Sequence, residues 1–336
     1  MRRLLTPLRL AGILAALVLV AGGVLYLVPS DDYLLLPDRA HPVAPLVDVQ
    51  GGKEPTGPGG IYFVDVLERR ASMFESLFPW IHDGATLVPA DLVVPPGVSD
   101  RAAHKADLRA MSISQKVAAA VALRRLGYKV TVKPSGVIVA ALDSRSHAIG
   151  KLEPADLIVS VNGRPTPTIT KLRAALSGLT PGATVTLTVR RGQGERTVTV
   201  KTIPDSFDSK RAIVGFQPEQ AAQIKLPLAV KIDAGNVGGP SAGLAFALEV
   251  MEELGHNVAH GYRVAATGEM ELNGAITPIG GVRQKVFGVR EAGVDVFLVP
   301  GENAAVARRY AHGLRVIPVK SFPQALHALA TLPPRG

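Results

Sequence analysis

The sequence predicts an α+β protein with an apolar N-terminal helix, a β-rich middle section and a mixed α/β C-terminal section. An uncharged apolar run near the N-terminus predicts the helix, and closely spaced alternating runs between residues 128 and 203 predict the β-rich section. After Pro204, helical and extended patterns alternate. The chain of 336 residues is 47% hydrophobic and 19% charged, which is typical of folded proteins, and its length suits two domains.

The N-terminal run, Leu10 to Val28, contains no charged residue and would span about 28 Å as a helix, close to the hydrocarbon thickness of a bilayer. Arginines in the preceding segment MRRLLTPLR, and Asp31 and Asp32 beyond the run, predict a cytoplasmic N-terminus. A cleaved signal peptide is the alternative, but its apolar core is usually only roughly 7–15 residues long, and no A-x-A site follows this run. We therefore expect a retained signal anchor that crosses the cell membrane once and leaves the body of the protein extracytoplasmic.

Charge and composition exclude several classes of site. Lysine and arginine outnumber the acids by 37 to 28, but they are scattered and aromatic residues make up only 5%, so no nucleic-acid partner is expected. The absence of cysteine excludes disulfides, thiol nucleophiles and thiolate metal sites. His256 and His260 have the spacing of a zinc-binding helix, but Asn257 stands where the catalytic glutamate would be and Gly255 ends the helical pattern. We expect these histidines in a loop, and neither a metal nor a cofactor.

The segment before the middle section is predicted to be mostly irregular. Residues 31–60 are rich in proline and glycine, which predicts linker and loop. The alternating run IYFVDVLERR, residues 61–70, predicts one strand. Residues 111–127 predict a helix that ends at Gly127.

The middle section combines short β-rich runs with one helical stretch, TITKLRAALSGL, and turn signals at Asn162-Gly163 and Pro181-Gly182. The segment GKLEPADLIVSVNGRPT, followed by this helix and a final hairpin, resembles a PDZ domain of the bacterial protease type. The resemblance implies binding of extended peptide tails by strand addition, in a groove between residues 136–142 and residues 170–179. The alternative is a small β-rich spacer.

Four residues are expected to contact such a peptide. Gly127 and Tyr128 would belong to the loop that holds the peptide carboxylate, and Val137 and Val139 to the strand beside the peptide.

Ser241 is the first candidate for chemistry, within GNVGGPSAGLAFALEV. An apolar helical stripe follows it, so Ser241 lies at a helix N-terminus, where unpaired N–H groups favour an oxyanion. Such a serine is also a favoured N-cap, which is the alternative interpretation. The small neighbours Gly238, Gly239, Ala242 and Gly243 would let a substrate backbone approach, and this favours a nucleophile. Gly239 or Ser241 itself could donate its amide to the oxyanion.

A serine nucleophile needs a base, and two candidates exist. Asp295 with His312 or His327 has the chain order of an α/β-hydrolase triad after G-x-S-x-G, but no HGG-type segment precedes Ser241. The second candidate is Lys285, which acts as a base only if burial lowers its pKa from about 10.4 to about 7–8, a change of roughly 4 kcal/mol. A lone lysine in this position is more often a solvated surface residue.

The two segments GGPSAGLAFALEV and TGEMELNGAITPIGGVRQKVFGVREAGVDVFLVP together resemble the proteolytic domain of Lon-type Ser–Lys peptidases. The resemblance implies a ribosomal protein S5 domain 2-like α/β fold, with Ser241 as nucleophile and Lys285 as general base. It implies supporting roles for Thr267, near the lysine amine, and for Glu269 in the same segment. It also implies polypeptide substrates and a possible homo-oligomer, a six-membered ring.

These observations predict four regions: residues 1–30, a cytoplasmic stub and transmembrane anchor; 31–125, a linker and the N-terminal part of the protease domain; 126–205, the PDZ domain; and 206–336, the Lon-type domain. The sequence contains no G-x4-G-K-[ST] motif, so we expect proteolysis without ATP. The predicted function is a membrane-anchored serine endopeptidase that cleaves unfolded or extended segments. The alternative is a non-catalytic, membrane-tethered PDZ adaptor.

Overall fold

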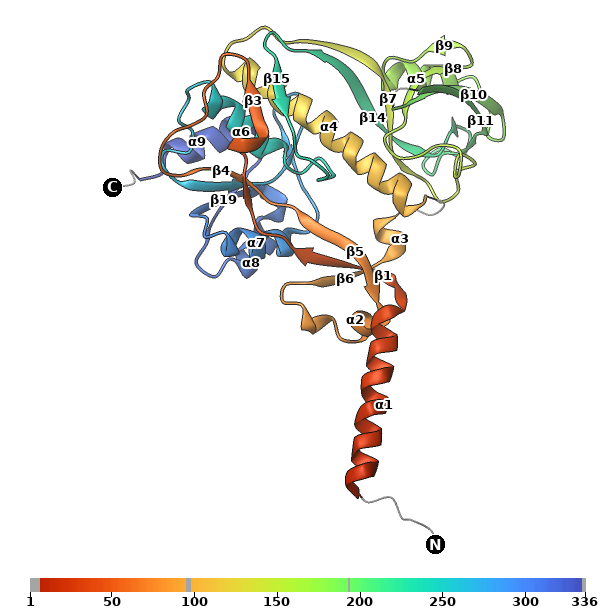
Figure 1. The fold of residues 1–336 in the computed structure, drawn as a ribbon. Helices are drawn as coiled ribbons and strands as arrows, with labels where there is room; N and C mark the ends of the chain where they lie inside the picture. The colour runs from red at the N-terminus through yellow and green to blue at the C-terminus, as the bar shows by residue number, and fades with distance from the viewer. Residues whose placement is uncertain (1–6, 95–97, 193, 334–336) are drawn as a thin grey trace.

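The N-terminal helix α1, Pro7–Leu27, projects away from the rest of the molecule (Figure 1). The structure is a computed structural model that describes residues 7–94, 98–192 and 194–333. Within α1, Leu10–Leu27 is long and apolar enough to cross a membrane, and its side chains are not buried by the rest of the chain. Arg2 and Arg3, on which the predicted orientation depends, lie outside the described residues.

We expected residues 31–60 to be a linker, but three strands form in or overlap this segment. They are β1 (Pro29–Pro37), β2 (His41–Pro42) and β3 (Val47–Val49). β1 is the centre of a three-stranded antiparallel sheet, between β5 (Val66–Ser72) and β6 (Thr86–Pro89). The short apolar run in β1 buries Leu34 completely, and the surrounding prolines and glycines hid this signal.

The run IYFVDVLERR forms two strands instead of one. β4 (Gly60–Phe63) joins the main sheet of the body, whereas β5 joins the small sheet around β1. Val64 and Asp65 connect them. One continuous run of alternating residues therefore contributes a strand to each of two sheets. The alternation itself does not indicate where the chain passes from one sheet to the other.

The main sheet has five strands in the order β2-β4-β16-β19-β20. Its C-terminal strands are β16 (Arg263–Ala266), β19 (Val296–Pro300) and β20 (Arg315–Val319). β4, β16, β19 and β20 are parallel neighbours, and β2 pairs antiparallel with β4. Because β4 precedes the middle section and β16 follows it, the body is built from both ends of the chain.

Helices cover both faces of this sheet. Val264, Ala266 and Leu298 pack in one core with α4 (Asp100–Arg125), α6 (Gly243–Glu253) and α9 (Phe322–Ala330). Ala265 and Phe297, which point to the opposite face, pack with α7 (Val282–Glu291) and α8 (Ala304–Tyr310). This alternation places α6 and α7 on opposite sides of one sheet.

Helix α4 begins at Asp100, eleven residues before the expected start at Met111. The Ser99 side chain caps it by accepting a hydrogen bond from the Ala102 amide. The helix ends at Arg125, and Gly127 follows with a left-handed φ of +86°. The predicted stop at Gly127 therefore agrees with the structure.

The middle section forms a separate lobe beside α4 (Figure 1). Its sheet has the order β11-β10-β8-β7-β14, with β9 added on β8. The elements are β7 (Thr131–Leu142), β8 (Leu157–Val161), β9 (Arg164–Pro165), α5 (Ile169–Leu176), β10 (Thr184–Arg191), β11 (Gly194–Lys201) and β14 (Phe216–Lys225). Since β14 pairs with β7, this sheet extends beyond the expected boundary at residue 205.

Short elements complete the fold. They are η1 (Ala44–Leu46), α2 (Met73–Leu77), η2 (Pro79–Ile81), α3 (Ala90–Val93), β12 (Ile203–Pro204), β13 (Ala212–Ile213), β15 (Val230–Ile232), β17 (Glu269–Met270), β18 (Ile276–Thr277) and η3 (Gly301–Asn303). The pairs β12–β13, β15–β3 and β17–β18 are antiparallel.

Candidate active site

Ser241 lies two residues before α6 and does not cap this helix. The N-cap is Ala242, and α6 has no side-chain cap. The Ser241 carbonyl accepts hydrogen bonds from the Gly268 amide at 2.8 Å and the Thr267 hydroxyl at 3.2 Å. These bonds fix the backbone of Ser241 against the segment that follows β16 and leave its hydroxyl available for another partner.

That partner is Lys285 on α7. Its Nζ lies 2.7 Å from the Ser241 Oγ and 3.1 Å from the Thr267 Oγ1. Lys285 is only 3% exposed and lies in the first turn of α7, which begins at Val282. Ser241, Thr267 and Lys285, which are far apart in sequence, therefore converge where β16 and α7 meet the start of α6.

Burial lowers the pKa of Lys285 from 10.5 to about 8, because the ammonium loses its hydration inside the protein. The carboxylates of Asp65 and Glu68 oppose this change by stabilising the ammonium. A protonated Nζ donates to both hydroxyls, whereas a neutral Nζ has a lone pair that can accept the Ser241 proton. At mildly alkaline pH the pair is therefore poised for proton transfer.

Two of the small residues near Ser241 serve packing instead of substrate access. A Cβ on Gly238 would lie 2.7 Å from the Asp107 Cβ, and a Cβ on Gly243 would lie 2.9 Å from the Ser114 Oγ. Both contacts are with α4. Because Gly238 and Gly243 are small, the loop that carries Ser241 packs directly on α4. We had expected all of the small residues around Ser241 to make room for the substrate.

Gly239 also differs from the expectation. It has a left-handed φ of +82° and open space where a Cβ would be, but its amide donates to the Asp107 carbonyl at 2.9 Å. An amide already bonded in this way does not face an oxyanion. The Ser241 amide donates to no acceptor among the residues that the structure describes, so it is the better oxyanion donor of the two.

The residues of the competing triad lie elsewhere. The Asp295 carboxylate accepts the Arg263 amide at 2.7 Å, at the start of β19. Within the described part of the chain, neither His312 nor His327 hydrogen bonds with Ser241. Of the candidate bases, Lys285 is the one that contacts Ser241.

The histidine pair with zinc-helix spacing lies in a loop, as expected. Gly255 follows α6 with a φ of +82°, and the His260 amide donates to the Asn257 side chain at 2.8 Å. His256 and His260 are therefore not on one face of a helix.

Glu269 lies on the wall of a cleft of about 750 Å³ instead of beside the lysine. The cleft runs between α4, the middle sheet and β17, and Pro240, next to the serine, is part of its wall. Burial raises the pKa of Glu269, and the nearby carboxylates of Glu219 and Glu271 raise it further. The cleft lies between the middle lobe and the loop that carries the serine, and Glu219, Glu269 and Glu271 are part of its wall.

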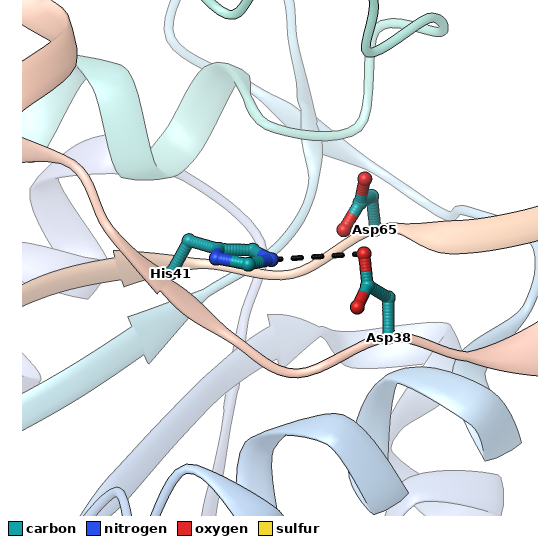
Figure 2. A group of neighbouring side chains, drawn as sticks. All are labelled: Asp38, His41 and Asp65. Carbon is teal, nitrogen blue, oxygen red and sulfur yellow. Dashed lines mark ion pairs between the residues drawn. The ribbon is translucent and has the colours of Figure 1, made fainter.

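Asp38, His41 and Asp65 form a cluster that has the donor set of a metal site (Figure 2). One ligand atom from each lies within 4.8 Å of the others, and His41 Nε2 is 3.6 Å from Asp38 Oδ2. The Oδ1 of Asp65 is buried and has no hydrogen-bond partner among the described residues. Burial and the Asp38 carboxylate raise the pKa of Asp65, whose charge also acts on Lys285. Within this cluster, Asp65 therefore supplies negative charge that acts on the lysine.

Of the four expected peptide-binding residues, Val139 borders the cleft beside Glu269, and none borders the cavity at α5 that is described below. Val137 and Val139 are fully buried in β7, and both edges of β7 are paired, with β8 and β14. Gly127 ends α4, and the Tyr128 amide donates to the Leu123 carbonyl at 2.9 Å. β14 occupies the position beside β7 that we had expected for a peptide.

An open groove lies next to β14, one strand beyond β7 at the edge of the sheet. A cavity of about 680 Å³ is bounded by α5, by residues 212–215 and by the start of β14. β14 is the last strand of its sheet, so its outer edge is free to pair within the described part of the chain. Apolar residues on both sides of Gly215, in AIVGF, were the signal for this loop, but they lie beyond the expected boundary of the middle section.

Comparison with known proteins agrees with this architecture. Residues 205–331 match the family model of the Lon protease (S16) C-terminal proteolytic domain, and residues 124–202 match that of the PDZ domain. The chain is 33% identical over 122 residues to Lon protease 2 of Bacillus subtilis (strain 168), covering 36% of this chain and 21% of that protein. It is 30% identical over 131 residues to Lon protease 1 of Sorangium cellulosum (strain So ce56), covering 36% and 16%.

The chain thus spans about one fifth of the length of these relatives. Among solved structures, the PDZ domain of an SdrC-like protein from Listeria monocytogenes is 19% identical, with a TM-score of 0.23, and the match covers 25% of this chain and 87% of that one.

Proposed function

We propose that this chain, which carries a Lon-type proteolytic domain and a PDZ domain, is a membrane-anchored serine endopeptidase with a Ser241–Lys285 dyad. The observation that carries the proposal is the 2.7 Å contact between the serine hydroxyl and an amine that is almost completely buried. The N-terminal helix supports the anchor. The arginines before it and the aspartates after it support a cytoplasmic N-terminus and an extracytoplasmic body.

The proposed chemistry is acyl transfer. Neutral Lys285 accepts the Ser241 proton as the Oγ bonds to the substrate carbonyl carbon, and the carbonyl π electrons become an oxyanion. The Ser241 amide stabilises this charge. When the C–N bond breaks, the lysine ammonium returns the proton to the leaving amine and an acyl-enzyme forms. Water then attacks the ester, and its proton passes through Lys285 back to Ser241.

We infer that the domains are interleaved. The PDZ unit takes residues 126–225, because β14 completes its sheet, and the proteolytic domain combines residues before and after this unit through β4 and β16. The PDZ groove would hold an extended peptide against β14, and the acidic cleft would lead the substrate to Ser241. Thr267 would orient the lysine amine, since it bonds to both Nζ and the Ser241 carbonyl.

The proposal is tested with the full chain in detergent, incubated with a disordered protein and with a tightly folded one, without nucleotide and with a chelator. Cleavage of the disordered protein alone is expected, because the sequence has no P-loop motif that would supply a motor for unfolding. Strict dependence on added ATP would contradict the proposal. Binding of peptide without any cleavage would favour the adaptor function.

The rate should depend on the protonation of Lys285. Because the neutral amine is the active form, kcat/KM is expected to rise with pH through about 8 and then level off. Asp65→Asn removes a charge that raises the pKa of Lys285, so the rise should move to lower pH. Asp48→Asn, at the exposed central residue of β3, is the matched control and should leave the profile unchanged. An unmoved profile in Asp65→Asn would show that this carboxylate does not act on the base.

The PDZ groove is tested by filling it. Ala174 is exposed on α5 and lines the cavity, so Ala174→Trp should weaken binding of a labelled unstructured peptide by about tenfold or more, measured by fluorescence anisotropy. Lys171→Trp, on the same helix but outside the cavity wall, is the control and should bind normally. Equal affinities for both variants would place the peptide elsewhere.

A further inference from the structure

A group of large apolar side chains is exposed at the foot of the body, in α2 and η2. Met73, Leu77, Trp80 and Ile81 are 38%, 54%, 72% and 46% exposed, and we call residues 73–81 the Met73–Ile81 patch. Contiguous apolar surface of this kind marks a contact with a protein or a membrane. Neither the dyad nor the PDZ groove uses it.

The patch is attached directly to the end of α1. The Met73 amide donates to the Val28 carbonyl at 2.8 Å, and the Ser76 hydroxyl donates to the Ser30 hydroxyl at 2.8 Å. Figure 1 shows α2 beside the C-terminal end of α1, on the side of the body from which α1 projects. The height of the patch along the α1 axis is therefore fixed where the apolar run of α1 ends.

Polar bonds to the buried Glu75 hold the segment from β5 to His82 together. Glu75 accepts the Ser72 amide, pairs with Arg69 at 2.5 Å and lies 2.7 Å from His82 Nε2. The Ser72 side chain in turn caps α2 by accepting the Glu75 amide. Polar groups of this segment thus point inward, whereas its apolar groups point outward.

The aromatic residues of this segment pack on one another. The Phe78 ring lies 4.9 Å from Phe74 and 5.2 Å from Trp80, which it meets edge-on at 88°. Tryptophan and tyrosine concentrate at the headgroup level of membranes, and Tyr26, exposed in the last turn of α1, lies at the same end of that helix.

We infer that the Met73–Ile81 patch lies in the lipid headgroup region of the leaflet from which α1 emerges and forms a second membrane contact. The inference rests on the proposed membrane span, because α1 sets the height of the patch. A bilayer is favoured over a protein partner because the patch is bonded to Val28, the residue that directly follows the apolar helix α1. This second contact restrains rotation of the body about α1 and holds the cleft at a constant distance from the membrane.

Trp80 is the only tryptophan of the chain and therefore reports on the patch directly. The full chain is reconstituted into phosphatidylcholine vesicles whose acyl chains carry bromine either near the headgroup or near the chain end. Emission of Trp80 should be quenched by bromine near the headgroup and much less by bromine near the chain end. In vesicles without bromine, the Leu77→Glu variant should show Trp80 emission at longer wavelength, because the added charge moves the patch toward water.

A second tryptophan position provides the control. The double variant Trp80→Phe with Tyr128→Trp carries its only tryptophan just after the C-terminal end of α4, which lies away from α1 (Figure 1). Brominated lipid should not quench the emission of this tryptophan. Vesicle sedimentation at alkaline pH reports insertion of α1 separately. Insertion without quenching of Trp80 would overturn the inference but keep the anchor, whereas failure to insert would overturn both.

Discussion

Ser241→Ala and Lys285→Met are each expected to reduce cleavage of a disordered substrate by about 10²–10⁴-fold or more, because the dyad loses its nucleophile or its base. Methionine matches the length of the lysine side chain without its charge, and the site is already buried. Both variants should therefore fold normally. The rate is measured by peptide release under single-turnover conditions, together with far-UV circular dichroism.

Lys285→Arg separates charge from base function. Arginine keeps the positive charge but stays protonated, so it cannot accept the serine proton and should be as inactive as methionine. Thr267→Val, which keeps the shape but removes the hydroxyl bonded to Nζ, should lower kcat by a smaller factor. Cleavage that persists in folded Ser241→Ala or Lys285→Met would exclude the dyad.

Gly288→Ala is expected to destabilise the protein and to inactivate it together. A Cβ on Gly288 would overlap the Asp38 carbonyl oxygen, and the Gly288 carbonyl accepts the Ala40 amide at 3.2 Å. The backbone of α7 therefore packs directly on the segment that follows β1. Since a backbone oxygen cannot move aside as a side chain can, α7 must shift, at a cost of about 1–3 kcal/mol or more.

Lys285 lies one turn before Gly288, so the same shift should separate Nζ from the Ser241 Oγ and lower kcat. The matched control is Gly280→Ala, just before the same helix, where an added Cβ meets no atom within 4 Å. Thermal unfolding and kcat are measured for both variants. A Gly288→Ala protein with unchanged stability and rate would show that α7 is not held by this contact.

The dyad variants and Gly288→Ala both test whether Lys285 is held in a buried position beside Ser241. The amine can act as a base only where water is excluded, and the exclusion depends on close packing of α7 against the sheet and the segment after β1. The carboxylates of Asp65 and Glu68 act in the opposite direction and keep the pKa of Lys285 near 8. The base is thus adjusted by residues that precede the PDZ unit, although it lies after this unit in the chain.

The sequence alone predicted the features that depend on neighbouring residues. An uncharged apolar run predicted α1, helical periodicity predicted α6, and the apolar run before Pro300 predicted β19. The mixed α/β architecture, with a PDZ domain and a Lon-type proteolytic domain, is confirmed. Ser241 and Lys285 were predicted as partners because their two segments together resemble the Lon-type Ser–Lys peptidases.

Only the tertiary structure decided which segments pair over long distances. It divided residues 61–70 between two sheets, placed β14 beside β7, where we had expected a bound peptide, and committed the Gly239 amide to Asp107. Local periodicity states that a strand exists but not which edge it joins, because hydrogen bonding between strands is the same for every sequence. Pairing is settled by the packing of side chains that are distant in the chain, and that packing is a property of the whole fold.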